Sequence, residues 1–333
     1  MTTVLLAAAG VALILLVVVD ALTTTLAVGS GAGPVCGRVN AALWRLLLRL
    51  HRRDRRSGAL GTAGIGLLLG SVAWWVLGLW AGWTLVLLSG RGVESDSTGA
   101  TAGFWDVAYY AGFTVSTLGV GDYVGTAPGW RVLTAVAGLS GLFLVTLAIT
   151  YLVSVVSAVV ARRALALRIH ALGESSTALV ARGWAGDAFT SAFVQHLVTL
   201  TGELVTSAEQ QVAYPVLRYF RSSDPDASTP LALARLDEAM LLLQAGVAPS
   251  ARPDVSAVDP VRRAVDRYLT TASGLLASRD LDDPPLPDLA VLADAGVPIG
   301  ESAELVAAAA QEGDRRRRLV ALVHEDGWSW PDA

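Results

Sequence analysis

Three long apolar segments dominate this chain and restrict what it can fold into. They cover residues 3–27, 61–89 and 132–161. Each is long enough for a bilayer-crossing helix, which needs about 20 apolar residues. Charged residues make up only 16% of the chain, against about 25% in soluble domains. The sequence therefore predicts an all-α membrane protein with three spans.

The distribution of arginine predicts how these spans are oriented. Seven arginines and one acid lie between residues 29 and 60, whereas residues 91–129 hold one arginine and four acids. Positive charge stays on the cytoplasmic side, so we expect the amino terminus outside, residues 29–60 inside, and Arg162 and Arg163 inside after the third span. Residues 1–28 could instead be a cleaved signal peptide. They lack a basic start, so we expect a retained extra transmembrane helix.

The linker of residues 29–60 has the pattern of a basic amphipathic helix. Such a helix lies on the membrane surface, with its apolar face in the headgroup region and its arginines near anionic lipid. Asp20, near the inner end of the first span, would be costly in lipid. We expect it to pair with a linker arginine or to reach the interface. The apolar positions are Val39, Ala42, Leu43, Leu46, Leu47 and Leu50, and the basic ones are Arg45, Arg49, Arg52 and Arg56.

The loop of residues 114–123, TVSTLGVGDY, spaces two glycines one residue apart. Carbonyls of an extended strand alternate sides, and turning successive carbonyls to one side requires positive φ, which glycine adopts readily. Gly119 and Gly121 supply that freedom, and Thr117 adds a hydroxyl. A row of such carbonyls can replace the water around an ion. The loop is thus predicted to be an ion-selectivity filter, with an ordinary extracellular turn as the alternative.

Residues 104–122, FWDVAYYAGFTVSTLGVGD, resemble potassium channels of the two-span pore family. The resemblance covers about residues 61–163. It implies an outer helix over 61–89, a pore helix over 104–116, a filter over 117–121 and an inner helix over 132–161. It further implies that K⁺ binds at Thr117, Leu118, Gly119 and Val120, with Gly121 completing the filter. The residues implied to support the filter are Ser116, Asp122, Tyr109 and Tyr110.

One position departs from that family. Where the family usually has Tyr or Phe, this chain has Val120, which cannot hydrogen-bond to Tyr109 or Tyr110. The resemblance still lets the Asp122 carboxylate reach a hydroxyl of the pore helix. Ion choice depends on how the carbonyl ring is held or on how many dipoles coordinate the ion. We therefore expect potassium to be preferred over sodium by a smaller margin than in channels with the usual Tyr.

Two further expectations concern the inner helix and the assembly. The resemblance makes Gly141 a candidate hinge, although close helix packing explains a small residue in a membrane equally well. The chain contains one filter and no internal repeat that would supply another. A central pore lined by one loop per chain requires several chains around an axis, and the family implies four. We expect a homotetramer in the lipid bilayer.

Residues 164–333 read as a helical cytoplasmic domain whose ligand or partner the sequence does not identify. Helical spacing favours helices over 188–201, 207–220, 231–245, 258–278 and 301–324. No nucleotide-binding Gly-x-Gly-x-x-Gly follows a strand in this part. The run of four arginines at 315–318 is predicted to be a solvated helix face, with a contact to anionic lipid or a partner helix as the alternative.

These patterns favour a potassium-selective channel in a bacterial inner membrane, and not an enzyme. No catalytic constellation is visible, and the expected cofactor is none beyond the permeant K⁺. The net charge of −4 implies no nucleic-acid partner. Two alternatives remain: a weakly selective monovalent cation channel, and a membrane-anchored sensory or scaffold protein whose pore is vestigial.

Overall fold

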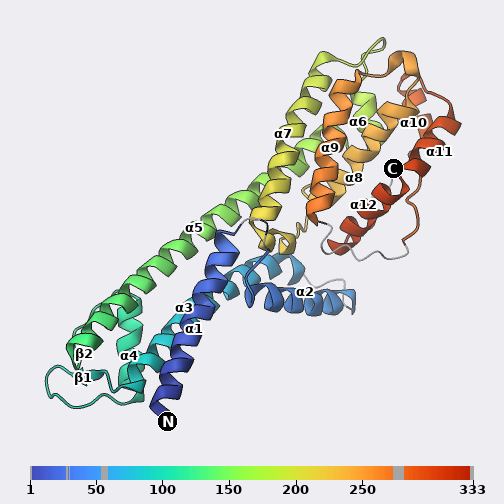
Figure 1. Ribbon diagram of the computed structural model, residues 1–333. Helices are drawn as coiled ribbons and strands as arrows, with labels where there is room; N and C mark the ends of the chain where they lie inside the picture. The colour runs from blue at the N-terminus through green and yellow to red at the C-terminus, as the bar shows by residue number, and fades with distance from the viewer. Residues whose placement is uncertain (1, 28, 30, 54–58, 273–280, 331–333) are drawn as a thin grey trace. The chain divides into compact units, whose positions relative to one another are not determined.

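The computed structural model describes residues 2–27, 29, 31–53, 59–272 and 281–330, and the described chain is almost entirely helical (Figure 1). It divides into two compact units. Unit 1 comprises Met1–Val156 with Ala213–Tyr219, and unit 2 comprises Ser157–Val212 with Phe220–Ala333. Arg56 of the predicted linker helix and the end of the helix predicted over 258–278 lie outside the described residues.

Among the described residues, three helices are long and apolar enough to cross a membrane: α1 (Thr2–Thr25), α3 (Ala59–Ser89) and α5 (Pro128–Leu172). This confirms the predicted all-α membrane class. Helices α1 and α3 pack along each other through glycines. A Cβ added at Gly78 would lie 2.6 Å from Val17, and one added at Gly82 would lie 2.6 Å from Ile14. Small residues let membrane helices approach closely, so these glycines set the contact of α1 with α3.

Asp20 of α1 is fully buried, and within the described residues its carboxylate is held by backbone and indole N–H groups and not by the linker arginine that was predicted. Its Oδ1 accepts hydrogen bonds from the backbone N–H of Val35 (2.7 Å) and Cys36 (3.1 Å). Its Oδ2 accepts one from the indole of Trp75 on α3, at 2.9 Å. The N–H groups are those that open α2 (Cys36–Arg53). The positive end of a helix stabilises a carboxylate, which explains how the charge is accommodated without a basic side chain.

Helix α2 has a protein-facing side and an exposed side. Cys36 and Asn40 are buried, and the Asn40 amide donates to the hydroxyl of Ser71 on α3 at 3.1 Å. The amphipathic character predicted for the linker is therefore present, although one side of the helix packs on unit 1. The exposed positions are Val39, Leu43 and Leu46 on an apolar face and Arg45 and Arg49 on a basic face.

Helix α5 continues past the predicted end of the inner helix at residue 161. Leu165, Ala166 and Ile169 are buried in the core of unit 2, so the same helix contributes to both units. The division between the units falls at Val156 and Ser157, earlier than the predicted boundary at residues 163 and 164. The apolar residues of its last turns explain this difference, because they pack with the other helices of unit 2.

Unit 2 is a helical bundle around one core (Figure 1). The two helices predicted over 188–201 and 207–220 form one helix that ends at Ala213, just before Pro215. The helix predicted over 301–324 is divided at Glu312. Two short helices were not predicted. The helices are α6 (Ser176–Gly183), α7 (Ser191–Ala213), α8 (Thr229–Leu241), α9 (Val255–Ala272), α10 (Leu289–Asp294), α11 (Ser302–Gln311) and α12 (Gly313–Glu325).

The arginine run of α12 is only partly the solvated face that was predicted: Arg318 is exposed and Arg317 is partly exposed, whereas Arg315 and Arg316 pack inside unit 2. Arg315 is paired with Asp237 of α8, with Nη2 and Oδ1 2.6 Å apart. Arg316 is paired with Glu238 at 2.7 Å, and both of these side chains are about 95% buried, with 4% and 5% exposed. Adjacent acids on α8 meet adjacent arginines on α12, so the run holds two helices of unit 2 together.

Candidate ion-selectivity filter

The predicted filter loop is framed by a short helix and a two-stranded ribbon. Helix α4 (Phe104–Val115) precedes the loop, and β2 (Tyr123–Gly125) follows it and pairs antiparallel with β1 (Val93–Ser95). Asp106 accepts a hydrogen bond from the backbone N–H of Gly103 at 2.9 Å, which caps the start of α4. It also accepts a hydrogen bond from the Tyr123 hydroxyl, and this bond raises the pKa of Tyr123. Asp106 thus connects both ends of the frame.

The backbone of the loop alternates in handedness. Thr117 has a φ of 58°, Gly119 of 62° and Gly121 of 88°, while Leu118 and Val120 between them do not have positive φ. The positive φ expected at the two glycines is confirmed. Its occurrence at Thr117 was not expected, since β-branched residues rarely adopt it. An alternation of this kind turns successive carbonyls toward one side, which ordinary extended backbone does not do.

The end of α4 holds the beginning of the loop. The carbonyl of Phe113 accepts hydrogen bonds from the N–H of Leu118 (2.8 Å) and of Gly119 (3.4 Å), and the carbonyl of Thr114 accepts one from Thr117 (3.0 Å). These bonds satisfy carbonyls that a helix end leaves free. They also explain how a strained Thr117 is maintained, because the surrounding hydrogen bonds over-determine its conformation.

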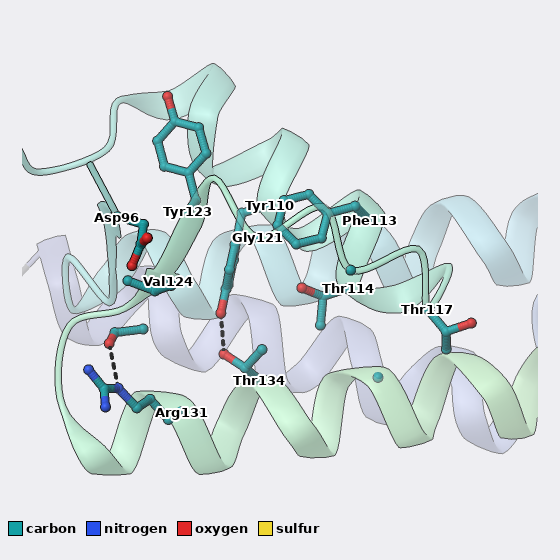
Figure 2. Close-up of a pocket in the computed structure, with 13 residues that line it drawn as sticks. Asp96, Tyr110, Phe113, Thr114, Thr117, Gly121, Tyr123, Val124, Arg131 and Thr134 are labelled. Atoms are coloured by element: carbon teal, nitrogen blue, oxygen red, sulfur yellow. Dashed lines mark hydrogen bonds between the residues drawn. The ribbon is translucent and has the colours of Figure 1, made fainter. Parts of the chain in front are cut away.

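The two tyrosines predicted to support the filter lie in different surroundings. Tyr109 interacts with the Asp122 carboxylate, and its ring lies 6.2 Å from that of Tyr123. Tyr110 instead hydrogen-bonds through its hydroxyl to that of Thr134 on α5, at 2.7 Å (Figure 2). Tyr109 is therefore beside the carboxyl-terminal end of the loop, whereas Tyr110 connects α4 to α5.

Side chains of the loop itself have few contacts within the chain. All of residues 116–122 are exposed, and the side chains of Leu118 and Val120 are 71% and 51% exposed. Beside the loop lies an open hollow of about 650 Å³, whose lining includes Tyr110, Thr114, Thr134, Gly119 and Gly121 (Figure 2). Within the described chain, the buried hydroxyl of Thr114 has no hydrogen-bond partner.

Two tryptophans of α3 position the helices around the loop. The indole of Trp80 donates to the carbonyl of Ala108 in α4 at 2.8 Å, and that of Trp83, one turn later, donates to the Ser140 hydroxyl of α5 at 2.9 Å. Both tryptophans lie within the predicted span of residues 61–89, where no role was predicted for them. Their separation by three residues puts both indoles on one helix face, and a buried indole N–H needs a partner, which is the signal that could have found them.

Gly141 is a close-packing position. A Cβ added there would lie 1.9 Å from the carbonyl oxygen of Val115, the last residue of α4. Helix α5 runs without interruption through this point. The structure thus supplies a packing reason for Gly141, the alternative to the hinge implied by the resemblance. Gly141 thus brings α5 against the end of α4, and the Trp83 hydrogen bond joins α5 to α3.

Comparison with known proteins agrees with this arrangement. Residues 65–158, which contain α4, the loop and most of α3 and the spanning part of α5, match the family model described as "Ion channel". The chain is also similar to "Uncharacterized membrane protein YdjJ" of Bacillus subtilis (strain 168), with 29% identity over 324 residues that cover 97% of this chain and 94% of that protein. No solved structure matches. The chain is a multi-pass membrane protein whose residues 65–158 are similar to ion channels.

Proposed function

We propose that the protein is a potassium-selective channel that lets K⁺ pass passively through a homotetrameric pore. The observation that carries this is the alternating handedness at Thr117, Gly119 and Gly121, in an exposed loop directly after a short helix. The carbonyls of Thr117, Leu118, Gly119 and Val120 are the proposed K⁺ ligands, because a row of carbonyls can replace the hydration shell of the ion. The carboxyl end of α4 adds negative potential near that row.

The tetramer follows from the contribution of one loop by each chain. A single loop covers only one side of an axis, so closure requires rotational copies. Apolar side chains of α5 that the described chain leaves uncovered are available to neighbouring subunits and lipid. They include Leu139, Phe143, Ile149 and Val153, which are between 56% and 68% exposed.

The proposed orientation puts the filter loop outside and α2 at the cytoplasmic surface. The arginine distribution supports it, and so does the position of α2. Its apolar and basic exposed faces suit an interfacial helix at an anionic leaflet. Unit 2 would then be cytoplasmic, in a bacterial inner membrane.

A weakly selective cation pore is the second candidate, and Val120 favours it. Its side chain is about half exposed and supplies no ring that could hydrogen-bond behind the loop. If selectivity depends on how firmly the carbonyls are held, a loop supported in this way discriminates less between K⁺ and Na⁺.

Flux measurements with purified protein in liposomes test the proposal. A potassium gradient should drive flux that exceeds sodium flux under matched conditions. Equal fluxes of the two ions would favour the weakly selective pore. Absence of flux from protein shown to be tetrameric would reject both and leave a sensory or scaffold protein with a vestigial pore.

A further inference from the structure

The connection between α7 and α8 is unusual because it leaves its own unit. Both helices contribute to the core of unit 2, yet Ala213–Tyr219 belongs to unit 1. This segment contains a short 3₁₀ helix, η1 (Pro215–Tyr219). The chain therefore passes from unit 2 into unit 1 and returns. Unit 2 is covalently joined to unit 1 through this segment as well as through α5.

The segment is buried in unit 1 and does not run over its surface. Leu217 is fully buried, and Val216 and Tyr219 are 5% and 4% exposed. Connecting segments normally lie on the surface. Burial of these three apolar side chains therefore indicates a specific binding site for the segment within unit 1, which we call its seat. The ring of Tyr219 packs 5.4 Å from that of Trp44 on α2.

The seat is formed by four elements of unit 1 and is closely filled. The remaining void has a volume of about 10 Å³, which is at the lower limit for one water molecule. The void is lined by residues of α1, α2, α3 and α5 and by the segment's own helix η1. Named by element, they include Thr24 (α1), Asn40 (α2), Ser71 (α3), Tyr151 (α5) and Val216 (η1).

The contact between Tyr151 and Tyr214 joins the segment to α5, the helix that follows the proposed filter. Tyr151 is 4% exposed. Its ring lies 5.9 Å from that of Trp75 and 6.1 Å from that of Tyr214. Trp75 is itself fixed by its hydrogen bond to Asp20. Tyr151 of α5 thus contacts both a residue of α3 that is fixed by a hydrogen bond and the connecting segment of residues 213–219.

We propose that residues 213–219 are a latch through which unit 2 controls the inner helix: while the segment is seated, Tyr214 holds Tyr151 in place, and the inner helix moves only when the segment leaves its seat. This proposal rests on the proposed function, since a latch on α5 controls conduction only if α5 lines a pore. In this proposal a movement of unit 2 is transmitted to the segment through α7, whose last residue, Ala213, begins the segment.

The first experiment locks the segment in its seat without altering Tyr214 or Tyr151. Trp44→Cys and Tyr219→Cys are combined in a Cys36→Ala background, which removes the native cysteine of the chain. The full-length tetramer is treated with a short, thiol-cleavable bis-methanethiosulfonate reagent, and cross-linking is verified by mass spectrometry. Single-channel records in planar bilayers should then show that the open and closed states each last at least tenfold longer than before treatment. Reduction should restore them, and each single-cysteine variant should not respond.

The second experiment releases the inner helix. Tyr214→Ala removes the ring, and Tyr214→Phe is the matched control that keeps it. In the alanine variant the open and closed states should each last at most one third as long as in the parent, with unchanged unitary conductance. The phenylalanine variant should behave as the parent. Hydrogen exchange of peptides spanning residues 148–156 should rise in the alanine variant and fall in the cross-linked protein.

Hydrogen exchange keeps the two proposals distinguishable, because it requires no ion flux. Altered exchange without current in any variant would reject the channel while supporting control of α5 by the segment. Parental dwell times and unchanged exchange in the verified cross-linked protein would overturn the latch and leave the channel in place.

Discussion

At the level of single residues, the filter loop depends on backbone conformations that few side chains tolerate. Gly119 and Gly121 have positive φ, and within the described residues of one chain a Cβ at either would meet no atom within 4 Å. Substitution there is therefore costly because of the backbone and not because of a clash. A left-handed conformation costs an ordinary residue roughly 1–2 kcal/mol, and a symmetric tetramer applies that cost to every subunit.

Gly119→Ala should reduce potassium flux to background in liposomes while leaving the tetramer intact on size-exclusion chromatography. Gly99→Ala is the matched control, because Gly99 has a φ of 64° and equally open surroundings but lies outside the loop. It should retain most of the flux. Potassium currents of normal size from Gly119→Ala would remove the filter assignment.

Val120→Tyr should increase the preference for potassium over sodium. An isopropyl group packs less than a phenol ring, and a more firmly held carbonyl ring discriminates better if rigidity sets ion choice. Reversal potentials under bi-ionic potassium and sodium conditions measure the change. A parent channel that is already strictly selective, and that is unchanged or worsened by the substitution, would show that the number of carbonyl ligands alone decides selectivity.

At the level of helices, the contact of α5 with α4 depends on one missing methyl group. Gly141→Ala would put a Cβ 1.9 Å from the Val115 carbonyl, whereas Gly138→Ala would put one 3.5 Å from the Thr114 carbonyl, an ordinary contact. The helix propensity of Ala favours both changes by about 1 kcal/mol, but overpacking at Gly141 costs roughly 1–3 kcal/mol or more.

We therefore expect opposite results from this pair. Gly141→Ala should lower the thermal midpoint of the detergent-solubilised tetramer and its potassium flux, and Gly138→Ala should leave both unchanged or slightly raised. If Gly141 were only a hinge, Gly141→Ala would change gating without lowering the midpoint, and the packing explanation would be wrong.

At the level of the two units, buried charge determines how well unit 2 is held together. Removal of one partner from a buried ion pair costs about 3–5 kcal/mol, because the other charge stays buried and unpaired. Arg316 is paired with buried Glu238, whereas the neighbouring Arg318 is exposed. Arg316→Leu should thus make unit 2 of the full-length protein far more sensitive to limited proteolysis. Arg318→Leu should match the parent, and equal sensitivity of both variants would mean that the pair contributes little.

The sequence by itself determined the membrane class, the three spans and the positions of positive φ at Gly119 and Gly121, because these depend on local composition and on the lack of a Cβ. The helix that the resemblance implies over 104–116 is observed as α4 over Phe104–Val115, and its start is fixed locally, because Asp106 accepts a hydrogen bond from the backbone N–H of Gly103. The positive φ of Thr117 was not predicted, since it results from hydrogen bonds to the end of α4.

Only the tertiary structure decided which distant groups meet. Asp20 binds Trp75, 55 positions later, and Arg316 binds Glu238, 78 positions earlier. Other polar or charged residues that could have been the partner lie near each of these residues in the sequence. A carboxylate also accepts hydrogen bonds from backbone N–H groups as readily as from an arginine side chain. The same holds for Gly141 and for residues 213–219, whose apolar side chains indicate burial but not the helices that bury them. Packing of whole helices selects those partners, and no local pattern records it.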